Sequence, residues 1–367
     1  MPFSFETLRR WPDLEGPELY AADAADRLIL DESAEARAAA VDGQLVVIGD
    51  DYGALTLAAA DAGARGIRVH QDGVIGEKAL AANAETAGLS DTFVSRDRDA
   101  ALLADARVVL LRLPRSLREL RDLAGLIALH AHPDVVVFAG GRLKHMTVTM
   151  NEVLREYFDR VDVSHARQKS RVLLARGPHD GAEPQPERAT VDGLEIRAFG
   201  GAFAGASIDI GTRLLLAHLP APSGDDAIDL ACGTGAVAAA LAVRHPSLRV
   251  IASDQSAIAV ASARATADAN GVADRIEVVR DDLLRSQPEA SASFIALNPP
   301  FHVGAAIHEG IAPRMFSDAA RVLRPGGELW TVWNSALQYR PALTRLVGPT
   351  RQVARDRKFT VTVSTKP

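Results

Sequence analysis

The chain has 367 residues, of which 47% are hydrophobic and 24% charged, and its formal net charge is −6. This length predicts two domains of ordinary size, and the composition excludes a largely disordered chain and a membrane span, since no apolar run approaches ~20 residues. A single cysteine, Cys232, excludes a disulfide framework and a cysteine-rich metal site, and we expect no metal ion. Because the start also lacks an apolar signal segment, we expect a cytoplasmic protein.

Apolar, strand-like runs alternate with alanine-rich, helix-like stretches along the chain. In the first half they are QLVVIG (44–49), ALTLAAADAG (54–63), GIRVHQD (66–72), EKALAANAETAG (77–88), ARVVLLRLP (106–114) and DVVVFAGG (134–141). In the second half they are AIDLACG (227–233), GAVAAALAVRH (235–245), LRVIASD (248–254), AIAVASARATADANG (257–271), RIEVVRDD (275–282), SFIALNPP (293–300) and GELWTVWN (327–334). Such alternation is typical of βαβ units. It predicts an α/β fold with two tandem Rossmann-like domains, each a mostly parallel, doubly wound sheet.

The two halves align with each other at a nearly constant spacing. Gly53 precedes Gly235 by almost the same interval of sequence by which Pro114 precedes Pro299. A spacing shared by residues of different types favours two copies of one fold over a general likeness between two α/β domains. We predict a first domain at residues 1–174 and a second at residues 194–367. The Pro-, Gly- and charge-rich residues 175–193 are the predicted connector.

A cofactor site is predicted at the start of the second copy. In AIDLACGTGAV, a strand carrying Asp229 leads through Gly233 and Gly235 into a helix. The glycines allow a tight turn and a close approach of a ligand, and the free N–H groups of the helix suit an anionic group. A dinucleotide dehydrogenase would more usually have a third glycine where this chain has Ala238, so NAD is the second choice.

Acidic residues end the next two predicted strands. Asp254 is placed for ribose hydroxyls, as acids are in dinucleotide sites. Asp282 is placed for an adenine amino group, and the adjacent Asp281 is its alternative. Because the carboxyl ends of parallel strands line one crevice, the acids and the glycine turn together favour a nucleoside ligand.

The fourth strand of the second copy ends in the motif NPPF. The side-chain oxygen of Asn298 and the carbonyl of Pro299 can each accept an N–H, and Phe301 offers a flat face for a base. Two acceptors on an aromatic amine favour withdrawal of its lone pair from conjugation, which makes the nitrogen a better nucleophile. The motif therefore predicts chemistry at an amino group without a strong base.

The combination of DLACGTG and NPPF resembles the class I S-adenosylmethionine-dependent methyltransferases that act on exocyclic or amide nitrogen. The longer forms NPPFH, GAFAGASIDIGTRLLLAHL and GIAPRMFSDAARVLRPGGELWTVWNSALQY, together with a degenerate first copy, resemble the ribosomal RNA guanine-N2 methyltransferases. The likeness covers Phe199 to the C-terminus closely and the first half in outline. It implies S-adenosylmethionine as cofactor and ribosomal RNA, a ribosomal subunit or an assembly particle as partner.

The same resemblance implies a role for each residue named above. Asp229 and the glycine turn would bind the methionine part of the cofactor. Asp254 would bind the ribose, and Asp282 the adenine. The NPPF residues would hold the target base. His302 belongs to the same pattern as a candidate substrate contact, and Phe203 and Asp209 match cofactor-proximal positions.

The first copy has lost this chemistry. VVIGDDYGAL has Asp51 where the second copy has a glycine, and LLRLPRSL replaces ALNPPFHV. An aspartate beside the turn would obstruct a carboxylate-bearing ligand by bulk and like charge, so we predict that the first domain binds no cofactor. We expect its Arg112, Arg115 and Lys144 to contact RNA phosphates, with a purely structural domain as the alternative.

Two other functions remain open from the sequence. NPPY-type relatives methylate adenine N6 or glutamine amides, but NPPFH and the degenerate first copy argue against them. A non-catalytic RNA-binding or assembly protein with a relic fold is disfavoured by the intact motifs. Because the two domains of this chain could cover each other, we expect a monomer.

Overall fold

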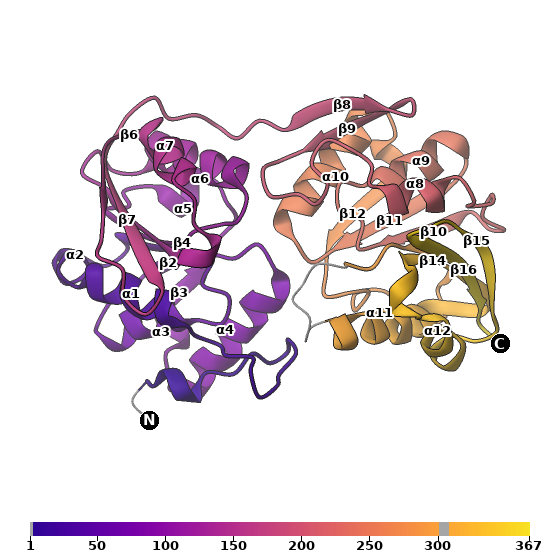
Figure 1. Ribbon diagram of the computed structural model, residues 1–367, viewed down its shortest axis with the longest axis horizontal. Coiled ribbons are helices and arrows are strands. Elements are labelled where there is room, and N and C mark those ends of the chain that lie inside the picture. Colours follow the sequence, from indigo (N-terminus) through magenta and orange to yellow (C-terminus); the bar gives the residue numbers. More distant parts are fainter. Residues whose placement is uncertain (1–2, 301–307) are drawn as a thin grey trace. The chain divides into compact units, whose positions relative to one another are not determined.

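A computed structural model of the protein describes residues 3–300 and 308–367 (Figure 1). The chain forms two compact units, Met1–Gln185 and Pro186–Pro367. Residues 175–193, which we expected to form a connector, include the end of strand β7 (Ser170–Pro178) and all of β8 (Glu187–Val191). Part of this polar stretch is therefore regular strand, because backbone pairing with a neighbouring strand does not require apolar side chains.

The first unit is built on a seven-stranded sheet with the order β3-β2-β1-β4-β5-β7-β6. Strand β7 is antiparallel to both of its neighbours, and the other pairs are parallel. The remaining strands are β1 (Leu45–Ile48), β2 (Ile67–His70), β3 (Phe93–Ser95), β4 (Val108–Arg112), β5 (Val136–Arg142) and β6 (Phe158–Val163).

Helices cover both faces of this sheet, so its central strands read as continuous apolar runs. One face packs against α1 (Ala24–Glu32), α3 (Ala54–Asp61) and α4 (Val74–Ala87). The other packs against α5 (Ala100–Leu103), α6 (Leu117–His130) and α7 (Thr149–Arg155). Helix α2 (Ala34–Ala39) follows α1. Successive β1 residues alternate between the two cores, with Val46 on one side and Val47 on the other.

The second unit repeats this architecture. Its sheet has the order β12-β11-β10-β13-β14-β16-β15, with β16 antiparallel to both neighbours. The strands are β10 (Asp226–Leu230), β11 (Arg249–Asp254), β12 (Ile276–Arg280), β13 (Ala292–Leu297), β14 (Leu323–Asn334), β15 (Thr350–Arg355) and β16 (Phe359–Thr365). The predicted fold class of two tandem, mostly parallel α/β sheets is confirmed.

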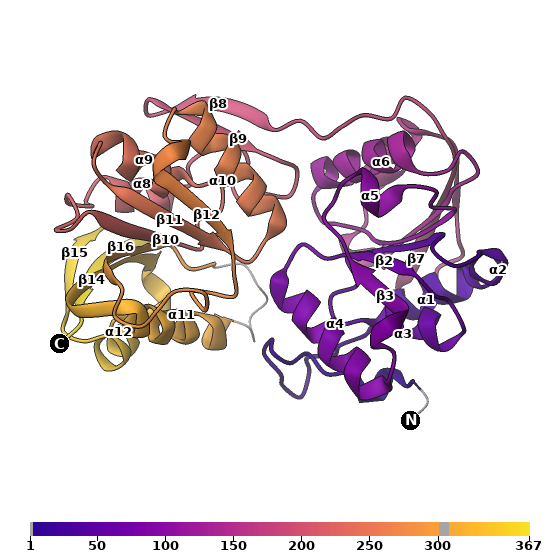
Figure 2. The same ribbon diagram turned by 180° about the vertical axis from the view of Figure 1, so that it is seen from behind.

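Helices of the second unit also lie on two faces (Figure 2). One face packs against α8 (Ile210–Leu216), α9 (Ala236–Arg244) and α10 (Ala257–Ala269), and the other against α11 (His308–Val322) and α12 (Arg340–Leu346). A hairpin of β8 and β9 (Leu194–Ala198) precedes them and packs its second strand along α10. Within the described residues, no helix is long and apolar enough to cross a membrane.

Candidate active site

The glycine turn of the second unit connects β10 to α9. Its backbone takes left-handed conformations at Ala231, Gly233 and Gly235, with φ of 58°, 53° and 75°. A Cβ on Gly235 would lie 2.9 Å from the Cβ of Ala263 on α10, so this glycine lets two helices pack closely. A Cβ on Gly233 would meet no atom of the described residues within 4 Å. The turn therefore leaves open space beside Gly233, which suits the close approach of a ligand to the backbone.

Asp229 lies at the end of β10, where it supports the start of α9. Its carboxylate accepts a hydrogen bond from the backbone N–H of Ala238 at 3.0 Å, and only 3% of the residue is exposed. Burial, with the negative charge of Asp254 nearby, raises the pKa of Asp229 to about 7. Cys232 in the same turn is buried in the core, and burial raises the pKa of its thiol, as expected for a packing residue rather than a nucleophile.

Asp254 joins the end of β11 to the glycine turn. One carboxylate oxygen accepts the N–H of Gly233 and the other the N–H of Ser256, each at 3.0 Å. The carboxylate of Asp281 accepts the N–H groups of Asp282 and Ser286, so Asp281 stabilises its own turn. The structure thus brings Asp229, Asp254 and Gly233 together at one edge of the sheet.

Asp282 lies in the same segment but is fully buried. Its carboxylate is 3.2 Å from Arg285 Nε and 3.9 Å from Arg314 Nη2. A contact with an adenine amino group would therefore share this carboxylate with two guanidinium groups. The spacing along the sequence gave no sign of this burial.

Asn298 follows β13, the strand beside β10. Its Nδ2 donates to Thr212 Oγ1 at 2.9 Å and faces the two carboxylate oxygens of Asp209 at 3.3 and 3.5 Å. Its Oδ1 is buried and has no hydrogen-bond partner among the residues that the structure describes. A buried acceptor without a partner costs free energy, and it marks a position where a ligand N–H would be favourable.

Other predicted residues of this site have different surroundings. Pro299 is buried next to Asn298, whereas Phe203 lies in the loop before α8 with 53% of its surface exposed. Phe301 and His302 lie outside the described residues. Sequence reasoning gave no role to Thr212, and it placed Asp209 near the cofactor rather than against Asn298. No sequence pattern links these residues, because Asp209 and Asn298 are 89 residues apart and meet only through the packing of α8 on the sheet.

The first unit keeps the backbone of this site with different side chains. Its turn between β1 and α3 is left-handed at Gly49, Asp51 and Gly53, with φ of 78°, 53° and 97°. Each of these positions precedes its counterpart in the second unit by the same interval of sequence. Asp51 thus adopts the same φ as Gly233 and carries a side chain in place of the glycine's hydrogen.

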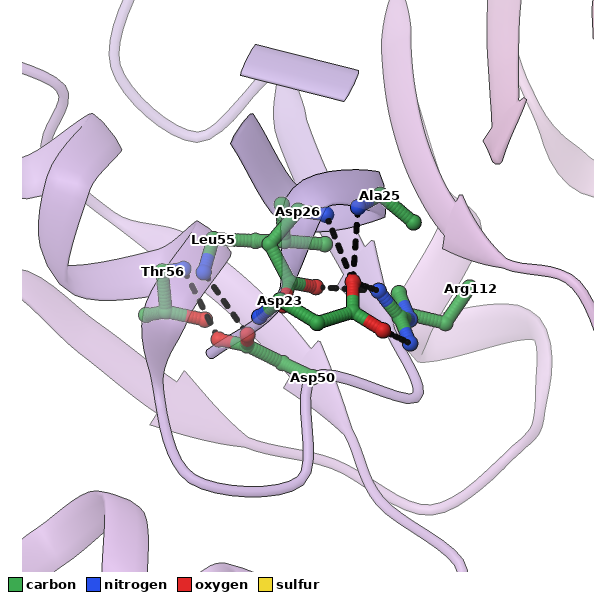
Figure 3. A network of polar contacts seen from close by, with 7 residues as sticks. All are labelled: Asp23, Ala25, Asp26, Asp50, Leu55, Thr56 and Arg112. Carbon is green, nitrogen blue, oxygen red and sulfur yellow. Dashed lines mark hydrogen bonds and ion pairs between the residues drawn. The ribbon is translucent and has the colours of Figure 1, made fainter. Parts of the chain in front are cut away.

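Arg112 stands in the first unit where Asn298 stands in the second. Each comes one residue after the last pair between the two central strands, β1 and β4 in the first unit and β10 and β13 in the second. Its Nη1 lies 2.9 Å from Asp23 Oδ1 and 2.6 Å from Asp26 Oδ1 (Figure 3). Burial raises the pKa of Asp26 to about 6, although the charge of Arg112 opposes the shift. We expected Arg112 to contact RNA, but its guanidinium is engaged inside the first unit by two carboxylates.

Arg115 and Lys144, by contrast, are exposed. They follow β4 and β5 at the carboxyl edge of the first sheet. Burial, together with the charges of Arg115, Lys144 and Arg142, lowers the pKa of His145. Arg115, Lys144 and Arg142 therefore form one positively charged cluster around His145, which we call the β4–β5 basic cluster.

The chain matches two known families over nearly its whole length. Residues 1–179 match the RLMG N-terminal domain, and residues 193–363 match the Methyltransferase small domain. The ribosomal RNA large subunit methyltransferase G of Streptomyces coelicolor is 35% identical over 100% of this chain and 99% of its own. This chain belongs to the large-subunit ribosomal RNA methyltransferase G family. The resemblance to ribosomal RNA methyltransferases is thereby confirmed.

Other members of the methyltransferase G family are similar to the same extent. The proteins of this name from Shewanella amazonensis and Pseudomonas paraeruginosa are 32% and 34% identical, each over 98% of this chain and 96% and 97% of their own. Among solved structures, the T. thermophilus 16S rRNA N2 guanosine methyltransferase RsmC, in complex with AdoMet and guanosine, has a TM-score of 0.75. It covers 96% of this chain and 97% of its own at 19% identity, which shows a shared two-copy fold.

Metal-binding side chains do not gather in the described part of this family member. No three His, Cys, Asp or Glu residues there are placed to hold a metal ion. The polar groups at the candidate site are instead carboxylates, an amide and backbone N–H groups, which are suited to binding an organic ligand by hydrogen bonds.

Proposed function

We propose that this protein methylates the exocyclic N2 of a guanosine in large-subunit ribosomal RNA with S-adenosylmethionine. The observation that carries the proposal is the buried Oδ1 of Asn298 within the NPPF motif, an acceptor that no described residue satisfies. The large subunit as substrate follows the names of the full-length relatives, and N2 of guanosine follows the motif and the named target of RsmC.

The second unit offers a fitting site for the cofactor. The open space beside Gly233 and the carboxylates of Asp229 and Asp254 lie at one edge of the sheet. Asp229 and the turn of Gly233 and Gly235 would hold the methionine part, Asp254 the ribose and Asp282 the adenine. S-adenosylmethionine supplies an electrophilic methyl group when it is bound.

Asn298 and Pro299 would act on the target amino group. Asn298 Oδ1 and the Pro299 carbonyl accept its two N–H groups, which draws the nitrogen lone pair out of conjugation. The N–H groups become stronger donors as the nitrogen forms its fourth bond, so these acceptors stabilise the transition state more than the ground state. Phe301 is our candidate for stacking on the base, and His302 for a further substrate contact.

The test is methyl transfer to ribosomal RNA from a strain that lacks the gene. Incubation with labelled S-adenosylmethionine, nuclease digestion and mass spectrometry should yield N2-methylguanosine in large-subunit RNA. N6-methyladenosine in the digest, or methylation of glutamine in protein, would instead support an NPPY-type activity. No methylation of naked RNA, ribosomal subunits or assembly particles would contradict the proposal, and calorimetry without cofactor binding would point to a relic fold.

Binding of the cofactor should depend on pH through Asp229. Its pKa of about 7 in the free protein means that the carboxyl group gains a proton as the pH falls through neutrality. A cationic ligand favours the carboxylate, so the dissociation constant should rise below pH 7, by up to about tenfold per pH unit. Calorimetry between pH 8 and 6 measures this. Asp229→Asn should bind more weakly and lack this dependence, and identical profiles for both proteins would contradict the role of Asp229.

The β4–β5 basic cluster should contribute to RNA affinity. Each phosphate contact that is lost lowers the dependence of affinity on salt concentration, so Arg115→Glu with Lys144→Glu should reduce the salt slope by about 2. Filter binding of ribosomal RNA at several salt concentrations measures the slope. The matched control is Arg155→Glu. Helix α7 leads away from the carboxyl edge of the sheet, so the exposed Arg155 at its end lies at the opposite edge. Equal slopes for all three proteins would favour a purely structural first unit.

A further inference from the structure

The amide of Asn298 has one orientation because of what lies behind it. An Asn side chain has nearly the same shape at its oxygen and nitrogen ends, so only its neighbours decide which end faces a ligand. Thr212 Oγ1 can either donate or accept a hydrogen bond. The carboxylate of Asp209 can only accept, and it therefore selects the Nδ2 end of Asn298.

Asp209 is itself held in place by helix α8. It is the N-cap of α8, and its Oδ1 accepts the N–H of Gly211 at 2.9 Å and of Thr212 at 3.3 Å. A Cβ on Gly211 would lie 3.1 Å from this oxygen and 3.2 Å from the ring of Phe359, so the first turn packs tightly. Because α8 packs on the same sheet that carries Asn298, the carboxylate has a fixed position behind the amide.

The first unit supplies a natural comparison. Asp23, Asp26 and Arg112 precede Asp209, Thr212 and Asn298, respectively, by one identical interval of sequence. Asp23 is likewise the N-cap of the helix packed on the sheet, and the group at the end of β4 donates to the first turn of that helix (Figure 3). The contact is thus kept in both copies. The two copies differ in the atoms of this side chain that do not contact the helix. A guanidinium has no acceptor atom, whereas Asn298 has Oδ1.

From this we infer that Asp209, assisted by Thr212, is a positioning residue that holds the Asn298 amide with Oδ1 toward the substrate. It makes the site an acceptor for an amino group rather than a donor for a carbonyl group. The inference rests on the proposed function, since it assigns the substrate-facing atom of the same site.

The test uses Asp209→Asn, because asparagine is as good an N-cap as aspartate but can both donate and accept. The Asn298 amide can then rotate so that its oxygen and nitrogen exchange places. We expect kcat to fall about tenfold or more, while KM for RNA, cofactor affinity and unfolding temperature stay unchanged. The matched control is Asp23→Asn, the same change at the equivalent cap, which should leave kcat unchanged.

A double-mutant cycle separates positioning from an independent role. If Asp209 acts through Asn298, Asp209→Asn should have no further effect on kcat in an Asn298→Ala background. A full kcat for Asp209→Asn, an equal loss in both backgrounds, or a loss of cofactor affinity would each overturn the inference. Failure of the proposed function is distinct, because the wild-type protein would then transfer no methyl group to guanosine.

Discussion

Replacing Asn298 by alanine should reduce kcat by about 10²- to 10³-fold. The variant lacks the buried acceptor that stabilises the amino nitrogen in the transition state, and the Pro299 carbonyl alone remains from the motif's two acceptors. Cofactor affinity should change little, since Asp229, Asp254 and the glycine turn are intact. Single-turnover methylation of ribosomal RNA and calorimetry with S-adenosylhomocysteine measure the two quantities separately.

The matched control for this variant is Asn151→Ala in the first unit. The Asn151 side chain donates to the carbonyl of Val148 at the start of its own helix, so we expect an unchanged kcat. If Asn298→Ala kept more than about a tenth of wild-type kcat, the central role of this acceptor would be contradicted.

Replacing Arg112 by asparagine should destabilise the first unit by about 3 kcal/mol. The change removes the positive charge next to Asp26, whose side chain is only 8% exposed. Its pKa, already raised to about 6 by burial, should rise further. When the pKa of a carboxyl group is higher in the folded than in the unfolded state, the folded state loses stability as the pH rises toward the folded-state pKa. The destabilisation of the variant relative to the wild-type protein should therefore grow above pH 6. Hydrogen–deuterium exchange of α1 and β4 measures it within the intact chain.

The second copy itself suggests the rescue. Adding Asp26→Thr to Arg112→Asn gives the first unit the side chains that Asp209, Thr212 and Asn298 form in the second. The buried acid is then gone, and we expect most of the lost stability to return. Equal exchange in the single and double variants would show that the charge of Asp26 is not the cause. Methyl transfer at saturating RNA should be unaffected in a folded double variant.

Much of the backbone could be predicted because it depends on local sequence. The alternation of strands and helices, the two copies and the glycine turn all follow from apolar runs and glycines that act within a few residues. The nearly constant spacing of the two copies even aligns Asp51 with Gly233, and both residues adopt the same left-handed φ. The candidate acceptor Asn298 likewise follows from its position at the end of a strand.

The sequence by itself therefore determined the fold class, the family and the position of the candidate site. Only the tertiary structure decided which side chains meet there. Asn298 and Asp209 are 89 residues apart, as are Arg112 and Asp23, and they come together because a capped helix packs on the sheet beside the strand end. An arginine in a sequence does not reveal whether it faces solvent or a buried acid, so the pairing of Arg112 with Asp23 and Asp26 could not be predicted. The physical reason is that long side chains pair with whatever the packing of distant elements brings within reach.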